Sequence, residues 1–230
     1  MPINGIIAYR PMSQDSPFDS PIAALRRNYM LCGLDETDLD PDPFKQFDIW
    51  FQEAVNCNGI LEPNAMVLST VSPSGQPRGR NVLLKGFNPN GFVFFTNYNS
   101  AKGRDLDANP HAALTFSWLE LERQICIVGT VTKTDRTSVE SYFHTRPRGS
   151  RLGAWASNQS SVIPDRSVLA ARLAEAENRF EGDVPPPPEW GGFRLVPERI
   201  EFWQGRTNRL HDRLRYRRDA DTWIIERLAP

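Results

Sequence analysis

The chain has few of the residues that build metal centres and disulfide frameworks. Its 230 residues include three cysteines, which are widely spaced and form no CxxC pair. Its three histidines, His111, His144 and His211, lack metal-ligand spacing. We therefore expect no metal cofactor and no disulfide framework, and we expect the cysteines to be buried free thiols in a reducing compartment.

Long apolar runs and the signatures of several enzyme classes are also absent. No segment is apolar enough to predict a membrane span, and the first residues lack a signal-peptide pattern. No GxGxxG motif follows a strand pattern and no Walker lysine motif occurs, which argues against a nicotinamide Rossmann domain and a P-loop NTPase. The formal net charge is −1, so nothing overall favours nucleic acid. We expect a cytoplasmic protein that binds neither nucleic acid nor a membrane.

The N-terminal part predicts a tail followed by helices. Residues 1–20 are rich in Pro, Ser and Asp, which predicts a flexible tail before a single domain over residues 21–230. A short helix is predicted over residues 21–29, and Asp42 followed by Pro43 predicts the start of another. In that second helix, helical spacing predicts a buried stripe of Phe44, Phe47, Phe51 and Val55.

Strand patterns dominate the rest of the chain. Turn sequences at residues 73–75 and 88–91 separate the first three strands, which predicts two hairpins in a meander. The predicted strands are 66–72, 80–87, 92–96, 112–118, 124–133, 193–196, 199–204, 209–217 and 222–228. The intervening segments predict helices at 100–109, 135–146 and 165–181 and a loop at 148–164. Mainly β structure with peripheral α-helices favours an antiparallel barrel over a doubly wound parallel sheet.

The segment 209–217 has the densest group of cations. Alternate side chains of a strand share a face, so the pattern places Arg209 and His211 together with Arg213, Arg215 and Arg217. The opposite face would have Leu210, Asp212, Leu214 and Tyr216. Guanidinium groups beside a histidine suit an anionic, planar, phosphate-bearing ligand. The alternative is a solvated basic edge strand.

Two further segments offer cations near the ends of elements. Arg80 and Lys85 flank a predicted strand on opposite faces, and a shared ligand requires an edge or a bulge. The alternative is two surface cations. Ser100 and Lys102 begin a predicted helix, where free backbone N–H groups favour a phosphate.

A third segment combines a phenol, a guanidinium and a hydroxyl. Tyr142 and Arg146 lie four residues apart and share a helix face, and Ser150 follows in the turn. Together they suit a second phosphate; the alternative is a tyrosine packed under an arginine that complements the helix dipole. Two candidate phosphate sites without an acid pair or a nucleophile triad indicate a phosphorylated cofactor that supplies the chemistry.

From about Leu25 to its end, the chain resembles the pyridoxine (pyridoxamine) 5′-phosphate oxidase family. The resemblance depends on four stretches in this order: RNVLLK at 80–85, RPRGSRLGAWAS at 146–157, EFWQG at 201–205 and RLHDR at 209–213. It implies a split β-barrel homodimer that binds FMN at the subunit interface.

The resemblance also implies roles for individual residues. The FMN site would include Arg80, Val82, Leu83, Lys85, Phe95, Thr96, Ser100, Lys102, Gln124, Gln159, Ser160, Trp203 and Arg213. Of these, Gln159 and Ser160 would come from the partner subunit. The substrate site would include Lys85, Tyr142, Arg146, Ser150, Arg209, His211, Arg26 and Tyr29. Arg209 and His211 would be the catalytic residues that face the substrate ring.

The implied reaction is oxidation of pyridoxamine or pyridoxine 5′-phosphate to pyridoxal 5′-phosphate, with O2 as acceptor and H2O2 as product. Two alternatives stay open. A related flavin oxidase acting on another aromatic compound, such as a phenazine precursor, would keep the FMN residues and lose the substrate phosphate clamp. A non-enzymatic flavin- or pyridoxal-phosphate-binding module would form no peroxide.

Overall fold

The structure, a computed structural model, describes residues 29–31 and 33–230. The predicted tail and almost all of the predicted helix at 21–29 lie outside these residues, so the division into a tail and one domain stays a prediction. The strands are β1 (Ala65–Val71), β2 (Pro77–Leu83), β3 (Gly86–Asn88), β4 (Gly91–Asn97), β5 (His111–Trp118), β6 (Arg123–Lys133), β7 (Trp190–Gln204), β8 (Asp212–Asp219) and β9 (Thr222–Arg227). The helices are α1 (Pro43–Asn56), α2 (Ala101–Ala108), α3 (Arg136–Thr145), α4 (Arg148–Ala156) and α5 (Ser167–Arg179), with 3-10 helices η2 (Glu36–Asp38), η3 (Leu119–Leu121) and η4 (Thr207–Arg209).

Side-chain caps begin three of the predicted helices. The side chain of Asp42 accepts a hydrogen bond from the Phe44 N–H at the start of α1, and Pro43 occupies the first helical position. Ser100 caps α2 and Asp135 caps α3 in the same way. Each cap satisfies an N–H group that has no partner inside the helix, and all three helix starts are confirmed.

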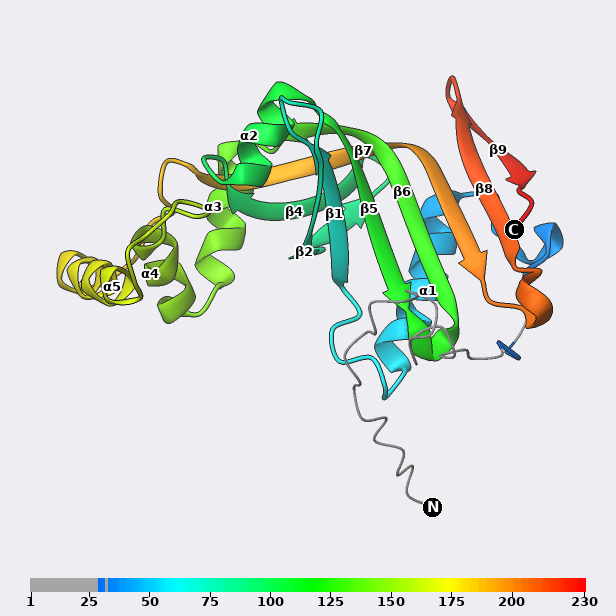
Figure 1. The fold of residues 1–230 in the computed structure, drawn as a ribbon, viewed down its shortest axis with the longest axis horizontal. Coiled ribbons are helices and arrows are strands. Elements are labelled where there is room, and N and C mark those ends of the chain that lie inside the picture. Colours follow the sequence, from blue (N-terminus) through cyan, green and yellow to red (C-terminus); the bar gives the residue numbers. More distant parts are fainter. Residues whose placement is uncertain (1–28, 32) are drawn as a thin grey trace, which may run out of the picture.

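The strands form one curled antiparallel sheet in the order β2-β1-β5-β6-β7-β4-β3, and β8 and β9 extend from β7 (Figure 1). The prediction of an antiparallel β architecture is confirmed. The predicted meander is wrong, because β4 pairs with β7 and the two hairpins lie at opposite ends of the order.

The predicted strand 80–87 is two strands that belong to different parts of the sheet. Up to Leu83, β2 pairs with β1. The Leu84 N–H still bonds to Asn64 beside β1, whereas the Lys85 N–H bonds to Val93 of β4. Between Leu84 and Lys85 the chain therefore passes from pairing beside β1 to pairing with β4. This short connection joins the two ends of the curled sheet.

The strand β7 links the two halves of the sheet. Its first residues, 190–195, pair with β4, whereas residues 199–204 pair with β8. The predictions at 193–196 and 199–204 are therefore one continuous strand. A register shift opposite Val128 and Gly129 leaves Glu198 as an extra residue beside Pro197. A bulge tolerates a proline and bends the strand, so Pro197 does not end it.

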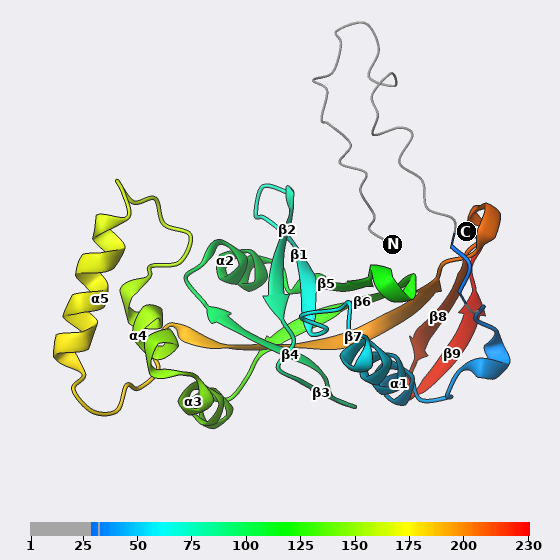
Figure 2. The same cartoon turned by 90° about the horizontal axis from the view of Figure 1, so that it is seen from below.

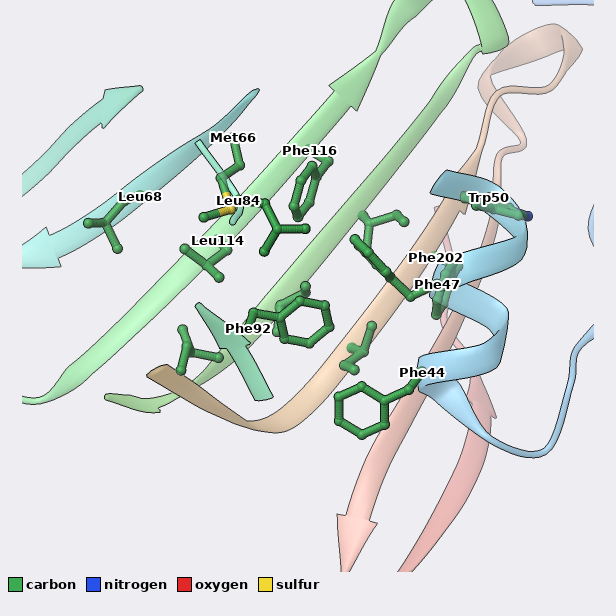
Figure 3. Close-up of a cluster of buried hydrophobic side chains, with 14 of the residues drawn as sticks. Phe44, Phe47, Trp50, Met66, Leu68, Leu84, Phe92, Leu114, Phe116 and Phe202 are labelled. Carbon is green, nitrogen blue, oxygen red and sulfur yellow. The ribbon is translucent and has the colours of Figure 1, made fainter. Parts of the chain in front are cut away.

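Helix α1 packs an aromatic stripe onto the sheet (Figure 3). Phe44, Phe47 and Trp50 are buried, and Phe47 contacts Phe92 and Phe116 edge-on with ring centroids 4.9 and 5.3 Å apart. Phe51 is only partly buried and Val55 is exposed, so the predicted stripe is wrong at its end. The buried face instead continues through Trp50 and Ala54.

The predicted loop at 148–164 contains helix α4. Leu152 is buried in a cluster with Ala176 of α5 and with Val184, and Ala156, one turn further along α4, is also buried. This tertiary packing outweighs the low helix propensity of Gly149 and Gly153. Helices α3, α4 and α5 lie together at one end of the molecule, and β8 and β9 lie at the other (Figures 1 and 2).

Some absences expected from the sequence can be compared with the described residues. None of their helices is both long enough and apolar enough to cross a membrane. No group of three or more His, Cys, Asp or Glu side chains within residues 29–31 and 33–230 is placed to hold a metal ion. Cys57 and Cys126 are free thiols that are half-buried, where buried thiols were expected, and Cys32 lies outside the described residues.

Candidate active site

A cavity of about 490 Å³ lies where β2 and β4 meet α3 and the start of α4, and we call it the basic cavity. Its lining is Asn81, Val82, Leu83, Lys85, Phe95, Thr96, Lys102, Tyr142, Thr145, Arg146, Pro147, Ser150, Gln159 and Trp190. Ten of these side chains were predicted for the FMN or substrate site. Asn81, Thr145, Pro147 and Trp190 were missed, although Asn81 and Pro147 adjoin predicted residues.

All the charged side chains that line the basic cavity among the described residues are cations. Lys85, Lys102 and Arg146 line it, and no aspartate or glutamate occurs among its described lining residues. The whole chain has a formal net charge of −1, so this local excess of cations is a feature of the site and not of the composition. Cations gathered in a concave site favour an anionic ligand.

Arg146 has an incompletely paired guanidinium group. It follows α3 and packs over the rings of Trp190 and Phe143, 4.9 and 5.3 Å from their centroids. Its NH1 atom is buried and has no hydrogen-bond partner among the described residues. Burial lowers the pKa of Arg146. A partly desolvated cation with a free donor is what a bound phosphate would satisfy.

Lys102 extends from the first turn of α2 into the same cavity. Its Nζ donates to Gln159 Oε1 at 2.8 Å and to Thr96 Oγ1 at 3.3 Å, both neutral acceptors. Burial and the nearby Arg80 charge lower the pKa of Lys102. The hydrogen bonds also show that Gln159 lies in the cavity of its own chain, whereas the sequence predicted it from the partner. Ser160, the next residue, is exposed and does not line the cavity.

An aromatic stack supports the cavity between its cations. The ring of Phe95 stacks on Tyr142 at 4.2 Å and on Trp190 at 5.4 Å, with nearly parallel planes. Lys85 Nζ lies 5.9 Å from the centroid of the Tyr142 ring. The stack holds Tyr142 beside Lys85 and Arg146, as the predicted phosphate clamp requires. Ser150 lines the cavity from the first turn of α4, whose free N–H groups and positive dipole end add to the attraction for an anion.

Two residues predicted to bind FMN lie behind the cavity lining. Arg80 donates to Thr70 Oγ1 at 2.6 Å and lies 3.6 Å from the buried carboxylate of Asp105. Burial lowers the pKa of Arg80, and the Asp105 charge opposes this effect. Ser100 is fully buried and its hydroxyl caps α2. Arg80 therefore lies close enough to lower the pKa of Lys102, but it does not line the cavity.

A second group of predicted residues forms an aromatic cluster far from α3. Tyr29, Trp203 and His211, which we call the ring cluster, have centroids 5.7 Å apart for Tyr29–Trp203 and Tyr29–His211, and 4.6 Å apart for Trp203–His211. In the sheet, Gln124 pairs with Trp203, and Trp203 pairs with Arg213. Directly paired residues point to the same face, so Gln124 and Arg213 lie beside the ring cluster.

Arg213, Arg215 and Arg217 alternate along β8 as predicted, but each of them is paired with a carboxylate. Arg213 makes two hydrogen bonds to Glu201, at 2.7 and 3.2 Å, which raise its pKa. Arg215 and Arg217 both pair with Glu226. These carboxylates come from β7 and β9, so the basic face is largely neutralised by its neighbouring strands. On the other face, Leu214 and Tyr216 are buried as predicted, but Leu210 is exposed.

Arg209 and His211 were predicted to belong to a strand, but both precede β8, which begins at Asp212. Arg209 ends η4, and it and Asn208 have left-handed backbone angles, with φ of 62° and 55°. Such conformations are strained in residues other than glycine and are frequent at functional sites. The Arg206 N–H donates to His211 Nδ1 at 3.1 Å, which leaves the proton of the neutral imidazole on Nε2. Burial, and then the Arg209 charge, lower the pKa of His211.

The structure therefore brings the predicted residues together in two places. The basic cavity is lined from β2, β4, α3 and α4, whereas Arg209 and His211 directly precede β8. Helices α3 and α4 lie at one end of the molecule, and β8 and β9 lie at the other (Figures 1 and 2). Arg26 lies outside the described residues. Within one chain, the predicted phosphate clamp and the predicted catalytic pair do not meet.

Comparison with known families gives two matches that together cover most of the chain. Residues 52–180 match the family described as "Pyridoxamine 5'-phosphate oxidase". Residues 190–230, which include Trp203, Arg209 and His211, match the "Pyridoxine 5'-phosphate oxidase C-terminal dimerisation region". The second match agrees with the predicted homodimer and places the β8–β9 end of the molecule in the dimerisation region.

Among solved structures, the chain is similar to PhzG from Burkholderia lata 383, which was solved with tetrahydrophenazine-1-carboxylic acid. The TM-score is 0.82 at 29% identity, over 89% of this chain and 100% of that one. A pyridoxamine 5′-phosphate oxidase-related, FMN-binding protein from Nostoc punctiforme has a TM-score of 0.65 at 18% identity, over 84% of this chain and all of that chain, and supports the fold alone.

Two curated relatives are considerably more similar in sequence. Pyridoxine/pyridoxamine 5′-phosphate oxidase 1 of Ralstonia nicotianae is 58% identical over 91% of this chain and 99% of its own length. Pyridoxine/pyridoxamine 5′-phosphate oxidase of Rubrobacter xylanophilus is 57% identical over 91% of this chain and 96% of its own. With the family match over more than half of its residues, the chain belongs to the pyridoxamine 5′-phosphate oxidase family.

Proposed function

We propose that the protein oxidises pyridoxamine 5′-phosphate or pyridoxine 5′-phosphate to pyridoxal 5′-phosphate, with dioxygen as the acceptor and hydrogen peroxide as the product. With pyridoxamine 5′-phosphate, water supplies the aldehyde oxygen and ammonia is released. The observation that carries the proposal is Arg146, a partly buried cation whose NH1 atom has no partner among the described residues, in a cavity whose described lining has no carboxylate. A phosphorylated substrate supplies the acceptors that this cation lacks. The relatives at 57–58% identity are named for the same activity.

The residues of the basic cavity fit FMN as the cofactor. Lys102 is a half-buried cation held by neutral acceptors, and Arg80 lies close enough to lower its pKa. An incoming phosphate would offset the desolvation of both cations. FMN, when bound, would accept the hydride equivalent from the substrate and pass the electrons to dioxygen.

The cavity cations and the ring cluster have different tasks in this proposal. Arg146, with Tyr142 and Ser150, binds the substrate phosphate, while Arg209 and His211 orient the substrate ring. Orientation of this kind lowers the barrier because the reacting atoms begin close and aligned. His211, with Nδ1 occupied by the Arg206 N–H, carries its proton on Nε2 and would donate a hydrogen bond from there to the substrate.

A second copy of the chain joins these two groups. In one chain they lie at opposite ends of the molecule, and residues 190–230 match a dimerisation region. We infer that the β8–β9 end of one protomer covers the basic cavity of its partner, so that two symmetric sites form at one interface. Such a shared site would bring Arg209 and His211 to the cavity in which the buried NH1 atom of Arg146 has no partner among the described residues.

A flavin should bind and stabilise the protein. Purified apoprotein incubated with FMN is expected to become yellow, and its melting temperature should rise. Ligand at about a hundred times its dissociation constant adds roughly 2.7 kcal/mol to the free energy of unfolding. Riboflavin, which has no phosphate, is the control and should bind more weakly. A protein that stays colourless with an unchanged melting temperature would contradict the assignment of the basic cavity.

The catalytic part of the proposal is tested by the absorption spectrum of the FMN-loaded protein. Anaerobic addition of pyridoxamine 5′-phosphate should bleach the flavin band, and air should restore it with formation of peroxide. Bleaching by tetrahydrophenazine-1-carboxylic acid, the molecule bound in the PhzG structure, but not by pyridoxamine 5′-phosphate would instead support a flavin oxidase that acts on a phenazine precursor. The cavity disfavours this alternative, because Tyr142, Arg146 and Ser150 are all present and line one space. A flavin that no substrate reduces would indicate a binding module.

A further inference from the structure

A buried carboxylate outside the basic cavity contacts the segment that carries Tyr29. Glu122 follows η3, between β5 and β6, and its side chain is directed toward residues 29–31. Its Oε2 accepts hydrogen bonds from the Met30 N–H at 2.9 Å and from the Leu31 N–H at 3.1 Å. Only 3% of Glu122 is exposed. We propose that Glu122 is a positioning residue, whose carboxylate fixes residues 29–31 and thereby the ring cluster.

The backbone of Glu122 is fixed to the strand that carries Trp203. Its carbonyl oxygen accepts from the Gly205 N–H at 2.7 Å and from Gln204 Nε2 at 3.2 Å. Its backbone is left-handed, with φ of 54°, which a residue other than glycine adopts only when the surrounding structure compensates. The carboxylate therefore projects from a rigid position at the end of β7.

The apolar side chains of the segment do not explain why it stays in place. Met30 is 78% exposed and Leu31 is 48% exposed, so neither side chain is buried in the core. Hydrogen bonds from two successive backbone N–H groups to one buried carboxylate are charge-assisted and are stronger than neutral ones. Among the contacts of the described residues, these two bonds and the packing of the Tyr29 ring hold the segment.

The Tyr29 ring transmits this placement to the ring cluster. It lies against Trp203 and His211, each with a centroid distance of 5.7 Å. Gly205 makes the close approach possible, since an added Cβ would lie 2.7 Å from Tyr29 Cγ and 3.1 Å from Glu122 Cβ. Glu122, Gly205 and Tyr29 are thus packed in direct succession, and the His211 ring lies at the end of this series.

The expected effect of Glu122 on catalysis rests on the proposed function, whereas its effect on the placement of residues 29–31 does not. Glu122 does not line the basic cavity, so we expect its carboxylate to act on the reaction through the segment 29–31 that it holds. Loss of the carboxylate should loosen this segment and leave the ring of Tyr29 less well placed. Orientation of the substrate by His211 should then be less effective, whereas FMN binding at the basic cavity should be unaffected.

The test compares Glu122→Ala and Glu122→Gln in the FMN-loaded dimer. Hydrogen exchange of the Met30 and Leu31 amides should be about ten- to a hundredfold faster in Glu122→Ala, since each lost bond to a charged group is worth about that factor. Its kcat/KM should fall by about tenfold or more, with unchanged FMN content. Glu122→Gln retains a neutral acceptor and should show smaller effects of the same kind. If Glu122→Ala does not fold, Glu122→Gln alone decides the question.

Glu120→Ala is the matched control, because Glu120 lies two residues away in η3 and is exposed. It should change neither exchange nor kinetics. Wild-type exchange at residues 30 and 31 in both Glu122 variants would overturn the proposed contact. Faster exchange with wild-type kcat/KM would overturn the link to the ring cluster. Absence of turnover in the unmodified protein would instead contradict the proposed function, and the exchange result would still stand.

Discussion

Replacing Arg146 by alanine is expected to raise the KM for pyridoxamine 5′-phosphate by about ten- to a hundredfold, with little change in kcat. We expect the guanidinium group to bind the substrate phosphate equally well in the ground state and in the transition state. Its loss should therefore weaken substrate binding without raising the barrier of the chemical step. The structure strengthens the expectation, because the buried NH1 atom of Arg146 has no partner among the described residues. Steady-state kinetics over a wide substrate range measures this directly.

Two controls separate the phosphate contact from general damage. Arg146→Lys keeps the charge but loses the planar fork, so it should recover only part of the affinity. Arg148→Ala removes a cation two residues away, which contacts the backbone carbonyls of Phe180 and Gly182 instead of lining the cavity. It should leave KM unchanged. A loss of kcat at constant KM in Arg146→Ala would assign this residue to the chemical step.

Replacing Arg209 by alanine should instead lower kcat by roughly a hundredfold, the loss expected when the reacting ring is misplaced by about 1 Å. Arg209 adjoins His211 through a strained left-handed turn, so its side chain is set by the backbone to act near that imidazole. FMN content should stay close to that of the unmodified protein. Single-turnover flavin reduction measures the affected step without product release.

Arg217→Ala is the control for this second substitution. Arg217 belongs to the same basic segment, but its guanidinium group pairs with Glu226. It should therefore change neither kcat nor KM. If Arg209→Ala weakened substrate binding and left flavin reduction at the normal rate, the division of tasks between Arg146 and Arg209 would be wrong.

Local patterns in the sequence predicted much of the fold. The caps Asp42, Ser100 and Asp135 each satisfy a helix N–H from within a few residues, so they are readable from the sequence alone. The antiparallel class also follows from the strand and turn patterns. Helix α4 was missed because its glycines indicate a loop, whereas the packing against α5 and Val184 that stabilises it leaves no local pattern.

Ten of the residues predicted for the site line one cavity, but the arrangement of the segment 209–217 was not predicted. The alternation in segment 209–217 indicated one strand with a free basic face. Left-handed residues at Asn208 and Arg209 delay the strand to Asp212, and Glu226 neutralises two of the cations. Neither a left-handed turn without glycine nor an ion pair between strands leaves a signal in the local sequence. The role of Glu122 was missed for the same reason, since its partners lie about ninety residues away.

The central claim is that each active site combines the basic cavity of one chain with the ring cluster of its partner. Mixing the Arg146→Ala and Arg209→Ala proteins under conditions that exchange subunits tests it most directly. Random pairing of two variants in a symmetric dimer should restore about a quarter of the sites, since half of the dimers are mixed and each has one intact site. At substrate concentrations below the wild-type KM, activity should rise well above the mean of the two parents. Activity that stays at that mean in verified mixed dimers would show that each site is built within one chain.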